Sequence, residues 1–230
     1  MEKNALLAAV LEGVHSKPLG TRLLPPLADD ELAVAIEHFS ADVWRDHELA
    51  RLRIADLDAL NQYVTECSRK KSPNNLGDEA RLALVLLSYL FSEMHERTNK
   101  DMRSREGEPV VISLGSDLAS AKKELGKIKA RKRWGRMSED CMLNAASLCS
   151  NPAILIAAGR YYLELMDADV PTAIAYFIAA CDRGKADMRT CDRMIDEFML
   201  QRMHLYIGMS LVNYLEEWKT FKRTHAGANR

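Results

Sequence analysis

The stretch that decides the fold spans residues 155–188, LIAAGRYYLELMDADVPTAIAYFIAACDRGKADM. Small and aromatic residues recur at helical spacings in both of its halves: Ala158, Gly159 and Tyr162 in the first, and Ala173, Phe177 and Ala180 in the second. Small side chains at such spacings let two helices approach closely, and the aromatic rings fill the space beside the crossing. The pattern predicts a helical hairpin, in which we expect Gly184 to end the second helix with the positive φ that glycine tolerates.

Residues 153–188 resemble a single tetratricopeptide unit, and within that family they are most similar to its Sel-like branch. The resemblance depends on Ala-Gly-x-x-Tyr in the first helix, on Ala-x-x-x-Phe in the second, and on the ending YFIAACDRGKADM. It implies a helical scaffold that binds other proteins on a concave face, with four aromatic residues near the groove: Tyr161, Tyr162, Tyr176 and Phe177. A simple helical hairpin inside an irregular helical domain explains the same residues without repeat ancestry.

The rest of the chain also predicts helices. Ala, Leu, Met, Glu and Arg are abundant, whereas aromatic residues (7%) and glycines (11 of 230) are scarce, and this composition favours helix. Residues 78–96, DEARLALVLLSYLFSEMHE, are hydrophobic nearly all round in their middle, which is typical of a core helix. Asp29 or Asp30 is expected to cap another helix, and residues 224–230 to form a frayed tail. We predict an all-α irregular bundle of eight to ten helices, with the tetratricopeptide-like hairpin in its C-terminal half.

Residues 98–115 break the helical pattern and contain the only β-like run, PVVISL. An isolated strand is not stable by itself, and long irregular loops are uncommon inside compact domains. We therefore predict a linker or extended loop here, between an N-terminal helical domain of residues 1–97 and a C-terminal helical domain of residues 116–230.

Positive charge is concentrated in residues 122–136, which carry eight basic side chains and one acidic one, whereas the whole chain has a net charge of −1. Such density attracts polyphosphate through counterion release, and Trp134 can stack on a base. An acidic protein surface, the chain's own acidic residues 29–66, or a merely solvated face are the alternatives. The candidate residues for binding nucleic acid or an acidic partner are Lys122, Lys123, Lys127, Lys129, Arg131, Lys132, Arg133, Trp134 and Arg136.

The sequence contains no complete catalytic or metal-binding motif. His95 and Glu96 begin like a zinc-protease helix, but position 99 is Asn, so the second ligand is absent. The five cysteines form no Cys-x-x-Cys pair, which argues against a zinc cluster or a disulfide framework. Cys181 and Cys191 are expected to pack as small hydrophobic side chains. We expect no enzymatic activity, no cofactor and no metal.

The predicted location is the cytoplasm, since free cysteines fit a reducing compartment. The apolar run near the N-terminus is flanked by Glu2 and Glu12, unlike a signal peptide, and no window approaches the roughly 18 apolar residues of a membrane span. We predict a non-enzymatic adaptor or regulatory protein that binds a protein partner, or a second copy of itself, through its C-terminal helices. The alternative is an RNA- or DNA-binding protein that uses residues 122–136.

Overall fold

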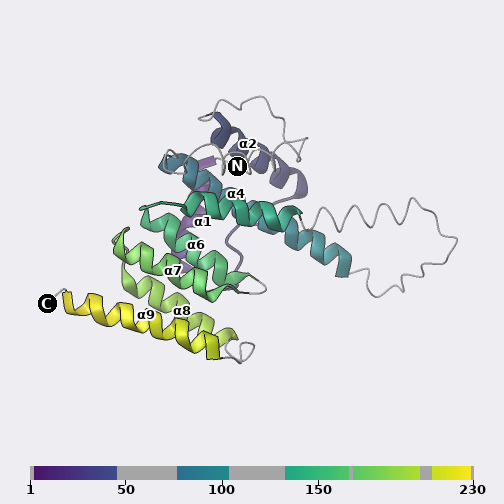
Figure 1. Ribbon diagram of the computed structural model, residues 1–230. Helices are drawn as coiled ribbons and strands as arrows, with labels where there is room; N and C mark the ends of the chain where they lie inside the picture. Colours follow the sequence, from purple (N-terminus) through teal and green to yellow (C-terminus); the bar gives the residue numbers. More distant parts are fainter. Residues whose placement is uncertain (1–2, 46–76, 104–132, 166–167, 203–208, 229–230) are drawn as a thin grey trace. The chain divides into compact units, whose positions relative to one another are not determined.

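The computed structural model describes residues 3–45, 77–103, 133–165, 168–202 and 209–228 (Figure 1). These ranges contain eight helices and no strand, which confirms the predicted all-α class. Seven helices are α1 (Lys3–Ser16), α2 (Asp29–Arg45), α4 (Asp78–Arg103), α6 (Pro152–Glu164), α7 (Val170–Asp182), α8 (Met188–Arg202) and α9 (Met209–Ala228). The eighth covers residues 133–146 and is called helix 133–146 below.

The chain forms two compact units. Unit 1 consists of residues Met1–Pro25, Leu76–Leu82 and Ala145–Arg230, and unit 2 consists of residues Pro26–Asn75 and Ala83–Asn144. Residues 98–103 of the predicted linker belong to α4, so the linker prediction is wrong there. Residues 104–115 lie outside the described residues, and the division into residues 1–97 and 116–230 stays a prediction.

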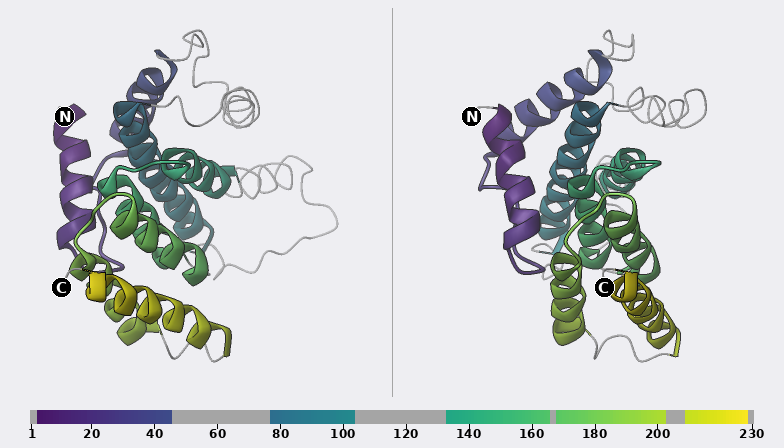
Figure 2. Two further views of the ribbon diagram at one scale, coloured as in Figure 1. Left: turned by 60° about the vertical axis from the view of Figure 1, so that its left-hand side comes forward. Right: turned by 90° about the vertical axis from the view of Figure 1, so that its left-hand side faces the viewer.

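The core of unit 1 is organised around α6, which packs against α1, α7 and α8 (Figure 2). All ten residues from Ile154 to Leu163 are buried. Asn151 caps the N-terminus of α6: its side-chain oxygen accepts a hydrogen bond from the amide of Ala153 at 3.0 Å. Pro152 follows at the first helical position, where the missing N–H costs no hydrogen bond. Because residues Ile154–Leu163 of α6 are all buried, the solvent-exposed surface of unit 1 around them is formed by the neighbouring helices.

The end of α7 differs from the prediction for Gly184. The left-handed residue is Lys185, with φ of 56°, and Gly184 does not have a positive φ. Glycine is needed at position 184 for a different reason. A Cβ there would lie 2.7 Å from the carbonyl oxygen of Ala180 and 3.0 Å from Cα of Pro152. The absence of a side chain therefore lets the end of α7 approach the start of α6.

Unit 2 is built on the contact between α4 and helix 133–146. Residues 83–91 of α4 are all buried, which confirms the predicted core helix. Ser88 and Ser138 lie between the two helices, and each hydroxyl donates to the other residue's carbonyl oxygen at 2.8 Å. One turn along, the rings of Phe91 and Trp134 stack with their centroids 5.7 Å apart. Small serines at the crossing and aromatic rings beside it allow a close antiparallel approach.

Two other predicted helix ends are corrected. Helix α2 begins at Asp29, so neither Asp29 nor Asp30 is its N-cap; Ala28 precedes the helix, and its amide donates to the Glu31 carboxylate at 2.8 Å. This is one half of a capping box. The predicted tail is also wrong for residues 224–228, because α9 continues to Ala228 and the ring of His225 packs on Phe221 at 3.9 Å between centroids.

Candidate functional site

The α6–α7 hairpin is held together by an aromatic ring that lies directly on a glycine. A Cβ built on Gly159 would lie 2.4, 2.6 and 2.8 Å from three ring carbons of Phe177. Phe177, Ala158 and Ala173 are fully buried at this crossing. Real Cβ atoms do not approach carbon so closely, so only glycine fits at position 159 while the ring keeps its place. The sequence correctly placed these small residues at the contact between the two helices.

The four aromatic residues expected near a groove lie in different surroundings. Tyr161, Tyr162 and Phe177 are buried in the core of unit 1, and Tyr176 alone among the four is partly exposed. Tyr176 stacks on Tyr162 with ring centroids 5.7 Å apart, and Tyr162 meets Tyr161 edge to face at 5.3 Å. Partial burial raises the pKa of the Tyr176 phenol. The ring contacts of Tyr161 and Tyr162 therefore hold Tyr176 in place. A protein that binds this part of the hairpin would contact Tyr176 rather than the three buried rings.

Helix α7 turns an uncharged strip to solvent. The sequence between Asp169 and Asp182 contains no charged residue, although eight of the 13 residues of α7 are exposed or partly exposed. Solvent-facing sides of helices normally carry charged side chains. Two neighbouring rows of residues form the strip, which we name the α7 face: Pro171, Ala175 and Ile178 in one row, and Thr172, Tyr176 and Ala179 in the other.

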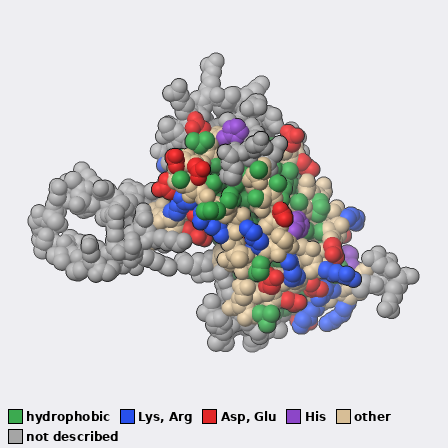
Figure 3. All heavy atoms as spheres, turned by 180° about the vertical axis from the view of Figure 1, so that it is seen from behind, with side chains coloured by type: hydrophobic (Ala, Val, Ile, Leu, Met, Phe, Trp, Pro, Cys, Tyr) green, Lys and Arg blue, Asp and Glu red, His purple; other side chains and the backbone are tan. Residues whose placement is uncertain are grey.

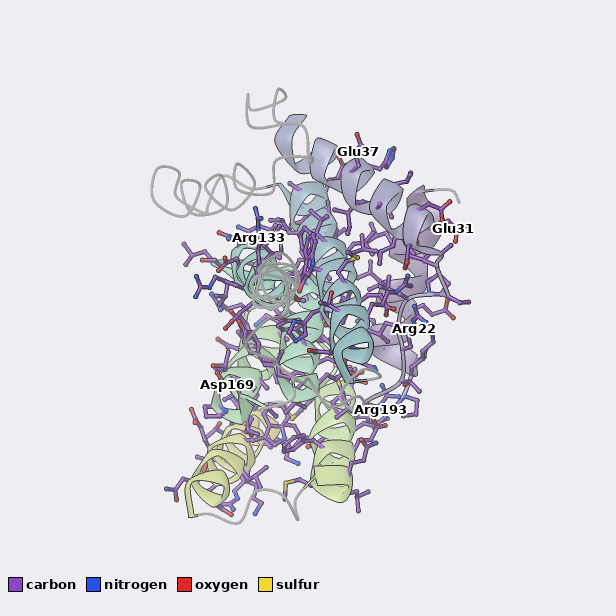
Figure 4. The ribbon with its side chains drawn as sticks, turned by 90° about the vertical axis from the view of Figure 1, so that its right-hand side faces the viewer. Arg22, Glu31, Glu37, Arg133, Asp169 and Arg193 are labelled. Carbon is purple, nitrogen blue, oxygen red and sulfur yellow. The ribbon has the colours of Figure 1, made fainter. Side chains whose placement is uncertain are left out.

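The start of α7 is fixed by Asp169, whose carboxylate accepts from the Thr172 amide at 3.2 Å and from the Thr172 hydroxyl at 2.7 Å (Figure 4). At the other end, Asp182 lies 3.7 Å from the His225 ring nitrogen of α9. The α7 face is therefore a short uncharged surface between two acidic ends, with Ala175 exposed and the other five residues partly exposed. Apolar surface rimmed by polar residues is one feature of sites that bind another protein.

A fully buried arginine joins α6 to the end of α1. The Arg160 guanidinium donates to four backbone carbonyl oxygens at 2.6–3.1 Å, and its other partner is the carboxylate of Glu164 at 2.9–3.0 Å. The four carbonyls belong to Gly13, Val14, Lys17 and Pro18. Gly13 and Val14 lie in the last turn of α1, and Lys17 and Pro18 follow it, so Arg160 caps the end of α1 from outside. The Gly13 carbonyl also accepts from the Lys17 amide at 3.0 Å.

The loop that follows α1 is bound by α6 and α8 as well. Glu164 accepts from the Gly20 amide at 3.0 Å, and Glu197 accepts from the Leu19 amide at 2.9 Å. Arg193 of α8 donates to the carbonyl oxygens of His15 and Ser16 (Figure 4). Burial and the charge of Arg193 lower the pKa of His15. Charged side chains from two helices therefore fix residues 13–20 as part of the unit 1 framework.

The sequence interpretation missed Arg160. One signal was available: Arg160 and Glu164 are the only charged residues of α6 and lie four positions apart in an otherwise apolar helix. A lone pair of opposite charges at that spacing inside a core helix indicates a buried polar contact rather than a solvated face. The local sequence carries no indication of the partner segment, which is 147 residues away.

Most of the predicted basic site, residues 122–132, lies outside the described residues. Arg133 and Trp134 are partly exposed, and Arg136 is exposed. One face of the Trp134 indole is taken up by the stacking with Phe91, so at most the other face is open to a nucleic-acid base. Binding of nucleic acid or of an acidic partner by this segment stays a prediction.

Several charged side chains on the surface of the C-terminal helices are paired with one another. Figure 3 shows Lys and Arg side chains gathered among Asp and Glu near the C-terminal end. Lys222 pairs with Asp192 at 2.6 Å, and Lys219 pairs with Glu216 at 2.7 Å. These pairs use charges that would otherwise attract an anionic ligand, in contrast to the uncharged α7 face.

Within the described ranges, no three His, Cys, Asp or Glu side chains lie together as a group that could hold a metal ion. No described helix is both long and apolar enough to cross a membrane. No protein family, curated protein or solved structure matches the chain.

Proposed function

We propose that this chain is a non-enzymatic helical adaptor or regulatory protein that binds a protein partner through its C-terminal helices. The observation that carries the proposal is the α7 face, an uncharged and partly exposed strip on a hairpin whose first helix, α6, is buried from Ile154 to Leu163. Tyr176 lies in its middle on a rigid stack of tyrosines. Rigid, partly exposed tyrosines contribute large contact area with little loss of conformational entropy on binding. The similarity of residues 153–188 to a tetratricopeptide unit supports the same function.

A charge placed on the α7 face tests this proposal. Ala175 is exposed, so Ala175→Arg is expected to leave the fold intact and to weaken partner binding at least about tenfold, because the arginine must be desolvated at the interface. The measurement is recovery of the partner from extracts of the source cells, followed by the dissociation constant for the purified pair. If the partner is a second copy, sedimentation equilibrium gives the constant.

Leu200→Arg provides the matched control, because Leu200 is 86% exposed and belongs to α8, not to the α7 face. This variant is expected to bind the partner as the native chain does. Equal binding by native and Ala175→Arg proteins would contradict the assignment of the α7 face as the binding surface.

The second candidate is nucleic-acid binding, which is favoured by the charge density of residues 122–136. Replacing Lys129, Arg131, Lys132 and Arg133 with Glu is expected to abolish binding to RNA or DNA oligonucleotides, and the native affinity is expected to fall steeply as salt rises. Fluorescence anisotropy at two salt concentrations measures both effects. Absence of native binding in about 50 mM salt would eliminate this candidate, because phosphate contacts are strongest at low salt.

A further inference from the structure

Two cysteines meet at the turn between α7 and α8. Cys181 lies in the last turn of α7 and Cys191 in the first turn of α8, and their sulfur atoms are 3.8 Å apart. The segment between them is short and includes Lys185 in the left-handed conformation, which brings the two helix ends together. The sequence indicated only packing for these residues, ten positions apart. The structure instead places two thiols in direct contact.

The two thiols have unequal surroundings. Cys181 is partly exposed, whereas Cys191 is fully buried. The hydrogen bond with Cys191 lowers the pKa of Cys181, and the same hydrogen bond together with burial raises the pKa of Cys191. A thiolate is the nucleophile in thiol–disulfide exchange, and access determines which sulfur reacts first. We therefore expect the Cys181 thiolate to attack an external disulfide first, and the buried Cys191 thiol to react second.

Neighbouring contacts hold Cys191 in place. The adjacent Asp192 carboxylate accepts from the Trp218 indole N–H at 2.8 Å and from Lys222 at 2.6 Å. Both donors come from α9, so α9 anchors the first turn of α8, which carries Cys191. A disulfide has an S–S bond of about 2.05 Å, so the two sulfurs must approach by roughly 1.8 Å for the bond to form.

We propose that Cys181 and Cys191 form a dithiol site that reacts with small-molecule disulfides of the glutathione type and closes to an intramolecular disulfide. In the first step the Cys181 thiolate attacks one sulfur of the small disulfide, and the other half leaves as a thiolate that takes up a proton. In the second step the Cys191 thiol loses its proton and attacks the Cys181 sulfur, which releases the second small thiol. Two protein thiols are oxidised and one small disulfide is reduced.

The test uses the full chain with Cys67→Ser, because Cys67 lies outside the described residues. The folded protein is incubated with glutathione disulfide, free thiols are blocked with iodoacetamide, and trypsin is added. Cleavage after Arg160, Arg183, Arg189 and Arg193 separates Cys181, in peptide 161–183, from Cys191, in peptide 190–193. The expected product is these two peptides joined by a bond that dithiothreitol breaks, with the loss of two free thiols per chain. Cys141 and Cys149 are buried and serve as internal controls that stay reduced.

Two variants separate the steps. Cys191→Ser is expected to stop at a stable glutathione adduct on Cys181, because no second thiol resolves it. Cys181→Ser is expected to leave Cys191 unmodified, because the remaining thiol is buried and holds its proton. A chain in which both cysteines remain free at equilibrium would overturn the proposal. So would a native chain that accumulates the Cys181 adduct without the joined peptides.

Discussion

Replacing Gly159 with Leu is expected to lower the stability of unit 1 strongly. The new side chain would occupy the place of the Phe177 ring, whose carbons lie as close as 2.4 Å to the position of a Cβ. Overpacking a tight core costs about 1–3 kcal/mol and occasionally more. Here α7 cannot move away from α6 without disturbing the other contacts between these two helices. We expect about 3 kcal/mol or more, which corresponds to a fall of about 6–12 °C in Tm for a chain of this size. Thermal unfolding followed by circular dichroism measures it.

Gly77→Leu is the matched control. A Cβ at position 77 meets no atom within 4 Å, so the same change of residue type causes no overpacking there. Gly77 precedes α4 at the N-cap position, where leucine is less favourable than glycine, so we expect a cost of about 0.5–1 kcal/mol. If Gly159→Leu melted at the same temperature as Gly77→Leu, the close crossing of α6 and α7 would be disproved.

Removing the charge of Arg160 is expected to be comparably damaging. Arg160→Met removes the charged donor from four carbonyl oxygens in and just after the last turn of α1, and it removes the ion pair between Arg160 and Glu164. Breaking a buried charged network by removing one partner costs about 3–5 kcal/mol. Urea unfolding of the variant is therefore expected to show a lower midpoint, and hydrogen exchange is expected to rise at the end of α1.

Two further variants show whether the loss of stability in Arg160→Met comes from the lost charge or from the lost hydrogen-bond geometry. Arg160→Lys keeps the charge but replaces five donors in a planar fork by three on one nitrogen, so we expect only partial recovery. Arg223→Met removes an exposed cation that lies 3.8 Å from Glu216, and its expected cost is about 0–1 kcal/mol. If Arg160→Met were as mild as Arg223→Met, the capping of α1 by Arg160 would be refuted.

The features that depend on local periodicity were predictable from the sequence. The helical class, the apolar α4 and the small residues at the α6–α7 crossing all follow from side-chain spacing, which is a property of neighbouring residues. The predicted N-cap of α2 was wrong by one or two residues. The N-cap is Ala28, which has no side chain that can accept a hydrogen bond, and the Glu31 carboxylate accepts from its amide instead. Helix α9 continued beyond the prediction because contacts of His225 with Phe221 and Asp182 support its last turn.

Features that depend on distant segments were not predictable in this way. The four carbonyl oxygens that accept from Arg160 lie more than 140 residues away in the sequence, and no local pattern identifies them. The burial of Tyr161 and Tyr162 follows from α6 being covered by three other helices, so the aromatic side chains of the hairpin are core residues with the exception of Tyr176. Contact between Cys181 and Cys191 likewise depends on how the turn between α7 and α8 is folded.

The α7 face can act as a binding surface only if α7 is held on α6 by the Phe177 ring lying on Gly159. A double-mutant cycle tests this contact directly, with the free energy of unfolding measured for Gly159→Ala in the native chain and in Phe177→Leu. We predict that the added methyl costs about 1–3 kcal/mol beside the phenylalanine ring. Beside leucine it should cost at least about 1 kcal/mol less, or even stabilise the helix, since alanine is the better helix former. An equal cost in both backgrounds would show that the ring does not lie on the glycine.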